Sequence, residues 1–198
     1  QWDISAIEEA ADRVCQTMYS DTCPFRRTLR YPSYYEILRS QSFVLGSNGF
    51  IQHPEVMGMQ AEDYDYLIEK PYDCLLERVI PRQYKSFHPD SPVEMALDLA
   101  KSYMTYTSEF AECGRIITGL VEKYGYYPGS RMGFTAAPFD FIADQLRGFK
   151  EISMDIRRIP EKLAQACEAV YPIVLKKGLP AKIVPDATIF IPLHMPTF

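Results

Sequence analysis

Two short apolar stretches decide the fold class: MGFTAAP at residues 132–138 and ATIFIPLH at residues 187–194. Each apolar run leads directly into a loop. The second run is apolar at successive positions, which is typical of a strand covered on both faces in a parallel sheet. Helical sequence lies before and between the two runs, so helix and strand alternate along the chain. This alternation predicts an α/β fold with one domain over residues 1–198.

The helices around these strands are indicated by their start and stop signals. A capping box of Ser5 and Glu8 begins the first helix, which is expected to end near residues 20–21. Ser91, Pro92 and Glu94 begin the longest helix, and Gly125 is expected to end it after residue 123. Further helices are expected at residues 33–38, 61–70, 72–80, 139–147 and 160–178, and a hairpin around residues 47–49.

Side-chain spacing makes further predictions within these helices. Pro71 separates two helices and Pro81 is expected to end the second, because a proline ring disrupts a continuing helix. Gly114 and Gly119 in the longest helix are expected to mark a bend or close packing. The residues expected along one side of a helix are Ile7, Ala11, Val14 and Met18 in the first and Leu99, Tyr103, Tyr106 and Phe110 in the longest.

Composition excludes several classes of protein. The net charge is −5 and no cluster of Lys and Arg is present, so nucleic acid is not an expected partner. No apolar run approaches the roughly 18 residues of a membrane span, and the first residues do not have a signal-peptide pattern. The five cysteines are widely spaced and include no Cys-x-x-Cys, which predicts a reducing, cytoplasmic location and no cysteine metal site.

Candidate chemistry lies where the two strands end, because working groups of α/β barrels gather at the carboxyl ends of strands. His194 ends the second run and could act as a hydrogen-bond donor, an acid or base, or a metal ligand; the alternative is a structural histidine. Asp140 and Asp144 follow the first run and would share a helix face. The alternative for these acids is that Asp140 caps the helix and Asp144 is solvated or pairs with Arg147.

Three further candidates lie in loops. Asp21 follows the first helix and, taken alone, is an ordinary loop acid. Arg26, with Arg27 and Arg30, would form an anion-binding surface or else a solvated basic loop. His53 precedes a proline and is a candidate substrate contact.

The segment TAAPFDFIADQLRG (135–148) resembles a conserved segment of uroporphyrinogen decarboxylases, and IFIPLHM (189–195) resembles their later strand that ends in a histidine. YSD (19–21) is similar to the turn that carries their essential aspartate. The order and approximate separation of the three segments agree with that family. The resemblance spans most of this chain but about half of a whole family member.

The resemblance implies a (β/α)8 TIM barrel of which this chain forms a part, since a whole barrel takes about 250 residues. It also implies a lyase that decarboxylates a tetrapyrrole without a cofactor, in porphyrin biosynthesis. Asp21 would contact the pyrrole N–H groups, with Asp144 and His194 as the other catalytic candidates. The predicted substrate-binding residues are Phe134, Pro138, Phe139, Leu193, His53 and Arg26.

The chain departs from the family pattern at two of these positions. Asp144 stands where the family has a tyrosine, and Leu193 stands where it has a substrate-binding serine. These departures leave two alternatives open. One is a methyltransferase of the same superfamily that uses zinc and a corrinoid protein, although no cysteine lies two residues after His194. The other is a non-catalytic binding protein or an inactive fragment. A homodimer is also left open.

Overall fold

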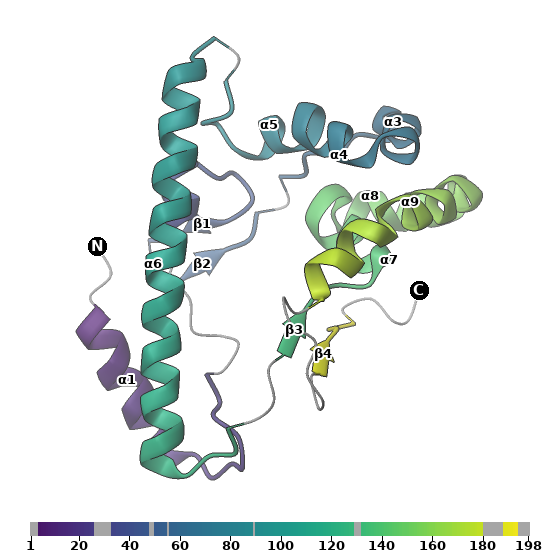
Figure 1. Ribbon diagram of the computed structural model, residues 1–198. Coiled ribbons are helices and arrows are strands. Elements are labelled where there is room, and N and C mark those ends of the chain that lie inside the picture. The colour runs from purple at the N-terminus through teal and green to yellow at the C-terminus, as the bar shows by residue number, and fades with distance from the viewer. Residues whose placement is uncertain are drawn as a thin grey trace.

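The computed structural model describes residues 4–25, 33–47, 50–54, 56–88, 90–128, 132–179 and 188–193. These residues form a mostly helical molecule with two small sheets (Figure 1). The elements are α1 (Ile4–Thr17), α2 (Ser33–Ile37), β1 (Val44–Leu45), β2 (Ile51–Gln52), η1 (Ala61–Asp63), α3 (Tyr64–Glu69), α4 (Pro71–Cys74), η2 (Leu75–Val79), α5 (Ile80–Gln83), α6 (Pro92–Tyr124), β3 (Met132–Phe134), α7 (Pro138–Asp140), η3 (Phe141–Arg147), α8 (Phe149–Arg158), α9 (Pro160–Gly178) and β4 (Thr188–Phe190). Among the described residues, no helix is long and apolar enough to cross a membrane.

The long helix α6 confirms the limits that were predicted for it. Pro92 occupies its first position, and Gly125 ends it in the left-handed region with φ of 67°. Ser91 is the N-cap residue, as predicted, but its side chain makes no cap bond, and the predicted capping glutamate Glu94 instead forms an ion pair with Arg39 at 2.6 Å. Proline at the first position and glycine after the last therefore suffice to set the helix limits.

A first hydrophobic core joins α1 to the C-terminal half of α6. Its buried residues are Ala11, Cys15, Cys23, Ile116, Leu120 and Tyr126. Of the face predicted for α1, Ala11 is buried, whereas Val14 and Met18 are exposed. The helix ends at Thr17, earlier than predicted, so Met18 falls beyond its last turn.

A second core lies among the helices that surround α3 and α9. Its largest fully buried side chains include Tyr64, Leu67, Ile142, Ile152 and Val170. They come from α3, η3, α8 and α9, which pack side by side (Figure 1). Helix α8 was not predicted. It follows Gly148, whose φ of 79° turns the chain between η3 and α8.

Pro81 does not end a helix, which corrects the prediction. The chain passes from α4 through the π-helical turn η2 into α5, and Pro81 is the second residue of α5. The N–H of Ile80 bonds to the carbonyl of Leu75, five residues back. The hydrogen-bond pattern changes from π-helical to α-helical directly before Pro81. The helix therefore does not require the backbone N–H that Pro81 lacks.

The hairpin β1–β2 is confirmed as antiparallel, with Val44 opposite Gln52 and Leu45 opposite Ile51. Its predicted Asn-Gly turn lies outside the described residues. A row of ring contacts connects this hairpin through α2 to α6. The ring centroids in this row are 4.4 Å apart for His53 and Phe43, 4.8 Å for Phe43 and Tyr35, 4.1 Å for Tyr35 and Tyr34, 5.3 Å for Tyr34 and Tyr106, and 5.8 Å for Tyr106 and Phe110.

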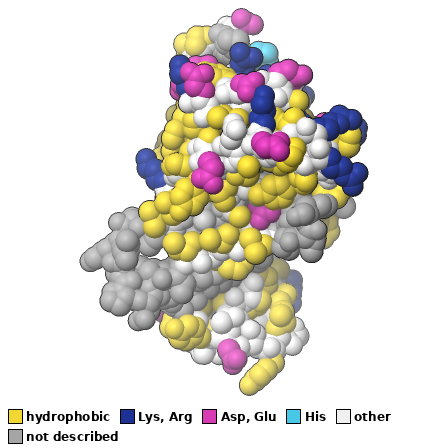
Figure 2. All heavy atoms as spheres, turned by 90° about the vertical axis from the view of Figure 1, so that its right-hand side faces the viewer, with side chains coloured by type: hydrophobic (Ala, Val, Ile, Leu, Met, Phe, Trp, Pro, Cys, Tyr) yellow, Lys and Arg dark blue, Asp and Glu magenta, His cyan; other side chains and the backbone are white. Residues whose placement is uncertain are grey.

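Strands β3 and β4 confirm the two apolar runs as strands, and they pair in parallel. Gly133 lies opposite Ile189, and Phe134 lies opposite Phe190. The expected burial on both faces is not found, because Ile189, Phe190 and Ile191 are exposed. Figure 2 views this side of the molecule and shows apolar side chains exposed across its middle.

Candidate functional site

The carboxyl ends of β3 and β4 lie next to each other, because the two strands run parallel, and together they form one edge of the sheet. The ladder continues one residue past β3, where the Thr135 N–H donates to the Phe190 carbonyl oxygen at 3.1 Å. The loop at residues 135–137 and the loop at residues 191–193 therefore leave the sheet side by side. This arrangement is the one that places ligands at the carboxyl ends of strands in α/β proteins.

Helix α9 holds this edge in place through close backbone contacts. The Thr135 hydroxyl donates to the Val174 carbonyl oxygen at 2.5 Å. A Cβ atom at Gly133 would overlap the carbonyl oxygen of Gly178, and one at Gly178 would lie 2.8 Å from the Thr135 Cγ2 atom. The absence of side chains at Gly133 and Gly178 thus lets the end of α9 approach β3.

Apolar side chains surround the strand ends. Phe134 is 51% exposed and its ring lies 6.0 Å from that of Phe190, while Leu193 is 61% exposed. Pro138 is partly buried at the start of α7, and Phe139 packs against the second core. The predicted residues Phe134, Pro138 and Leu193 therefore stand on or directly beyond one edge, which offers an apolar contact surface.

The two predicted acids lie in the helices that leave this edge. Asp140 is buried in α7, and Asp144 is partly buried in η3. The alternative role of Asp140 as a helix cap is not found: α7 begins after Ala137, and Asp140, which directly precedes η3, makes no side-chain cap bond to it. The chain continues from α7 into a π-helical turn from Phe141 to Arg147, in which four residues are again close to one full turn. The segment is therefore helical, which is the condition under which the two acids were expected to share a face.

The remaining predicted residues lie elsewhere. Asp21 is exposed and its carbonyl oxygen accepts a hydrogen bond from the Tyr127 N–H at 2.8 Å, beyond the end of α6. His53 is exposed on the hairpin and stacks on Phe43. Asp21 thus lies near the end of α6 and His53 follows β2. Figure 1 shows β2 and the end of α6 apart from β3 and β4. Arg26 and His194 lie outside the described residues.

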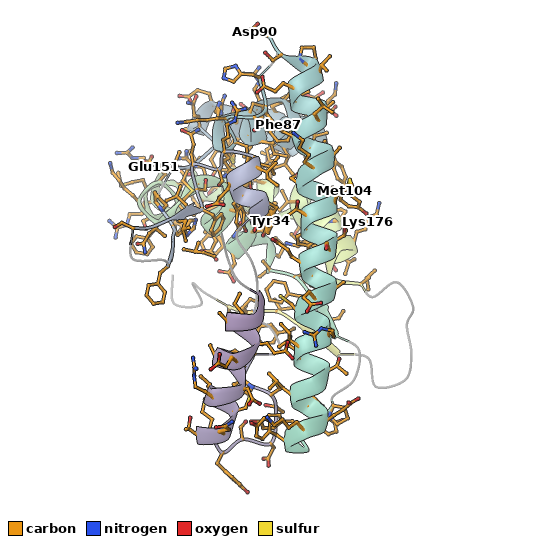
Figure 3. The ribbon with its side chains drawn as sticks, turned by 90° about the vertical axis from the view of Figure 1, so that its left-hand side faces the viewer. Tyr34, Phe87, Asp90, Met104, Glu151 and Lys176 are labelled. Carbon is orange, nitrogen blue, oxygen red and sulfur yellow. The ribbon has the colours of Figure 1, made fainter. Side chains whose placement is uncertain are left out.

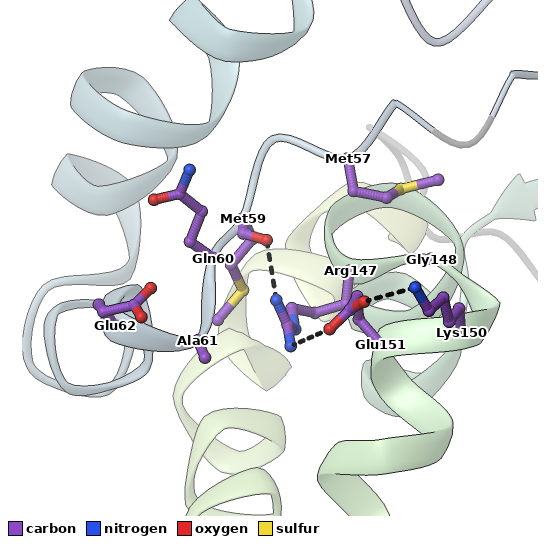
Figure 4. A pocket seen from close by; sticks show the side chains of 9 residues that line it. All are labelled: Met57, Met59, Gln60, Ala61, Glu62, Arg147, Gly148, Lys150 and Glu151. Carbon is purple, nitrogen blue, oxygen red and sulfur yellow. Dashed lines mark hydrogen bonds and ion pairs between the residues drawn. The ribbon is translucent and has the colours of Figure 1, made fainter.

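A cleft of about 520 Å³ lies beside Arg147, and sequence reasoning did not predict it (Figure 4). It lies between the segment before α3 and the start of α8. Its lining residues are Met57, Met59, Gln60, Ala61, Glu62, Arg147, Gly148, Lys150 and Glu151.

The charges at this cleft are largely paired within the protein. The Arg147 guanidinium is buried and binds both oxygens of Asp155, at 2.7 and 3.0 Å. It also donates to the Met59 carbonyl oxygen at 3.1 Å, and the Tyr64 hydroxyl donates to Asp155 at 2.8 Å. Burial and the Asp155 carboxylate raise the pKa of Tyr64. Burial alone would lower the pKa of Arg147, but its bonds to Asp155 raise it. We therefore assign this cluster a structural role.

No group of three or more His, Cys, Asp or Glu side chains that could hold a metal ion occurs within the described ranges. Comparison of the chain with models of protein families, with curated proteins and with solved structures finds no match.

Proposed function

We propose that this chain forms part of a uroporphyrinogen decarboxylase-like (β/α)8 barrel, and that the whole protein decarboxylates a tetrapyrrole without a cofactor. The observation that carries this proposal is the parallel pairing of β3 and β4. It brings together, at one edge, the start of the segment 135–148 and the described residues 189–193 of the segment 189–195, which are two of the three segments that resemble the family. In barrels of this class, the carboxyl ends of the strands carry the active site.

The exposure of the strand pair also supports a larger sheet. Strands of a parallel sheet are normally covered by helices and neighbouring strands on both sides. Here Phe134, Ile189 and Phe190 are all exposed. Additional strands of a complete barrel would pair with the edges of β3 and β4, and its helices and interior side chains would cover the two faces.

The proposed chemistry divides polar and apolar roles among the candidate residues. By the resemblance, Asp21 would stabilise the protonated pyrrole that forms before carbon dioxide is lost. Because Asp21 lies beyond the end of α6 and outside the β3–β4 edge, this role requires a substrate site that also reaches the end of α6. Phe134 and Leu193, which are exposed at the edge, would contact the apolar faces of the macrocycle. Asp144 replaces a phenol with a carboxylate, and Leu193 replaces a hydroxyl. We therefore expect a substrate whose carboxylate pattern differs from that of uroporphyrinogen, since like charges repel.

The test is anaerobic incubation of the full-length protein with uroporphyrinogen and related porphyrinogens, followed by chromatography of the products. We expect products that have lost carboxylates, with the activity abolished in Asp21→Asn and retained in Asp73→Asn, a substitution at an exposed acid of α4. No decarboxylated product from any porphyrinogen would refute the proposal. Methyl transfer from methylcobalamin to a thiol, in the presence of zinc, would instead assign the protein to the methyltransferases of the same superfamily.

A further inference from the structure

The outward face of α6 carries a stripe of apolar and small side chains that nothing in the described structure covers. The stripe repeats with alternating steps of four and three residues and consists of Val93, Leu97, Ala100, Met104, Thr107, Ala111, Gly114 and Thr118. All eight are exposed; Val93 is 74% and Met104 is 70% exposed. A stripe with this spacing is the seam along which two helices pack in a coiled coil.

This stripe is a second face of α6 and not part of the protein's own core. The buried residues of α6 are Ser102, Cys113, Ile116 and Leu120, which lie on the opposite side of the helix. Figure 3 shows Met104 on the side of α6 that faces away from Tyr34 of α2. Gly114 has no atom within 4 Å of the place of a side chain, so the expected close packing within the chain is absent there.

The stripe can be buried without leaving polar groups unsatisfied. The Thr107 hydroxyl donates to the carbonyl oxygens of Tyr103 and Met104, at 3.0 and 2.9 Å. The Thr118 hydroxyl donates to the Gly114 carbonyl oxygen at 2.9 Å. Since both hydroxyls are already bonded within the helix, covering them does not carry the cost of an unpaired buried donor.

A row of polar side chains runs along one flank of the stripe at intervals of seven residues. Its members are Glu94, Lys101, Ser108, Arg115 and Glu122, and all are exposed. Four of them are charged, and the neutral serine stands in the middle. In an antiparallel pair of α6 helices, this row faces the same row of the partner with its direction reversed. The order of the charges therefore decides which alignment of the two helices is favourable.

One antiparallel alignment brings opposite charges together. When Glu94 stands opposite the partner's Arg115, Lys101 stands opposite the partner's Ser108, and the symmetry repeats both pairs. The first pair joins opposite charges, and the second sets a cation against a neutral side chain. In this alignment no two like charges of the row face each other.

Sliding the helices by seven residues in either direction makes like charges meet. In one direction Lys101 faces the partner's Arg115, and Glu94 faces the partner's Glu122. In the other direction Lys101 faces the Lys101 of the second copy. Because like charges set against each other disfavour association, the row selects the first alignment over both of its neighbours.

The selected alignment also matches large side chains to small ones along the stripe. Leu97 faces the partner's Gly114, and Met104 faces the partner's Thr107. The symmetry repeats each of these layers, so every large side chain meets a small one. The contact extends over roughly 38 Å at 1.5 Å per residue.

The other flank of the stripe is aromatic. Tyr103 is 68% and Phe110 is 69% exposed. In the selected alignment Tyr103 stands opposite the partner's Phe110, which adds two aromatic pairs and their large apolar area. A parallel pair is disfavoured, because it would set the charged row of one copy against this flank of the other and lose the opposite-charge pairs.

We propose that two copies of this chain associate through the stripe on α6, antiparallel and in this alignment. Glu94 and Arg115 already have exposed partners in Arg39 and Glu8, so their pairs across the dimer contribute modestly. Lys101 forms no ion pair with another described residue. The position opposite Lys101 is therefore the place where a new charge has the clearest effect on the dimer.

The decisive experiment is sedimentation equilibrium of the whole chain with variants at Ser108. Ser108→Glu should tighten the dimer by about 5-fold and Ser108→Lys should weaken it by about 5-fold, because each adds two symmetry-related contacts with Lys101. Ser108→Gln, which adds length without charge, should leave the dissociation constant near its native value. Adding Lys101→Glu to Ser108→Lys should restore the affinity.

Two further variants test the stripe itself. We expect a monomer for Met104→Glu, whereas Leu76→Glu, at an exposed site on η2, stays dimeric. Circular dichroism checks that each variant is folded. A monomeric native chain would overturn the proposal, and so would equal dissociation constants for Ser108→Glu and Ser108→Lys.

Disulfide cross-linking tests the direction of the two helices. Ala100→Cys chains mixed with Ala111→Cys chains should form a cross-linked dimer, because the proposed alignment sets these positions opposite each other. Ala100→Cys chains alone should not cross-link. Efficient cross-linking of Ala100→Cys alone would overturn the antiparallel alignment.

Discussion

At the scale of single residues, the buried group of Arg147, Asp155 and Tyr64 is the feature with the largest expected effect on stability. Arg147→Met leaves the Asp155 carboxylate buried without its cation, so we expect a loss of roughly 3–5 kcal/mol in the free energy of unfolding. Replacing all three residues, by Met, Leu and Phe, removes every charge and should cost less than Arg147→Met alone. Urea denaturation of the two variants measures the difference. An equal or larger loss in the triple variant would contradict this expectation.

A second prediction at this scale concerns acid stability. Asp63 is buried, and its carboxylate accepts bonds from Arg82 and from the Gln60 N–H. Burial alone would raise the pKa of the Asp63 carboxyl, but these bonds lower the pKa by a larger amount. The pKa of Asp63 in the folded protein therefore lies below the ordinary value for aspartate. The carboxylate therefore stabilises the fold at neutral pH. This stabilisation is lost as the pH falls below about 4, the unfolded value.

Asp63→Asn provides the check on this assignment. Urea denaturation from pH 7 to pH 3 should show a steeper decline in the free energy of unfolding for the native protein than for the variant. Asp65→Asn is the control, since Asp65 is exposed and its ion pair with Lys162 lies at the surface. Parallel pH curves for the native protein and Asp63→Asn would refute the assignment.

At the scale of the elements, the contact between β3 and the end of α9 depends on two glycines. Gly133→Ala would force the backbone of Gly178 away, so we expect a loss of about 1–3 kcal/mol. Gly119→Ala in α6 is the matched control. Its new Cβ meets no atom within 4 Å, and alanine favours the helix, so stability should rise by up to about 1 kcal/mol. Thermal denaturation of both variants distinguishes the loss of packing between β3 and α9 from the general effect that replacing glycine by alanine has on stability.

Sequence signals predicted the elements whose limits are set locally. Gly125 and Pro92 fix the ends of α6 without help from the rest of the chain. The prediction that Pro81 ends a helix failed because the π-helical turn η2, which precedes Pro81, depends on the packing of η2 against the rest of the protein. Helix α8, which was missed, buries the charge of Asp155 against Arg147, eight residues before it, and against Tyr64, which is distant in the sequence. The sequence alone does not show that Tyr64 is a partner of Asp155.

The same distinction separates the parts of the candidate site. The strand ends were predicted because apolar runs followed by loops are visible in the sequence, and the parallel pairing confirms that expectation. The exposure of Phe134 and Leu193 could not be predicted, because it depends on what covers the sheet. The cleft beside Arg147 joins residues 57–62 to residues 147–151, and no local pattern connects them.

At the scale of the whole molecule, the two hydrophobic cores share no residue. We therefore expect them to open separately. Ile116→Ala should cost about 2–5 kcal/mol in the first core. Hydrogen exchange followed by mass spectrometry should then show lost protection in α1 and the C-terminal half of α6, with α3 and α9 unchanged. Ile152→Ala is the reciprocal variant. Equal loss of protection in both cores would show that they unfold as one unit.

The row of ring contacts from His53 to Phe110 gives the protein a built-in optical signature. Tyrosines held in fixed orientations by neighbouring rings produce circular dichroism in the near ultraviolet, and this signal disappears when side-chain packing loosens while helices persist. Tyr34 and Tyr35 come from α2, and Tyr106 comes from α6. Part of the near-ultraviolet signal therefore depends on the docking of α2 on α6, while other fixed rings, such as those of Tyr124 and Tyr126, contribute the rest. Neither part depends on the far-ultraviolet signal that measures helix content.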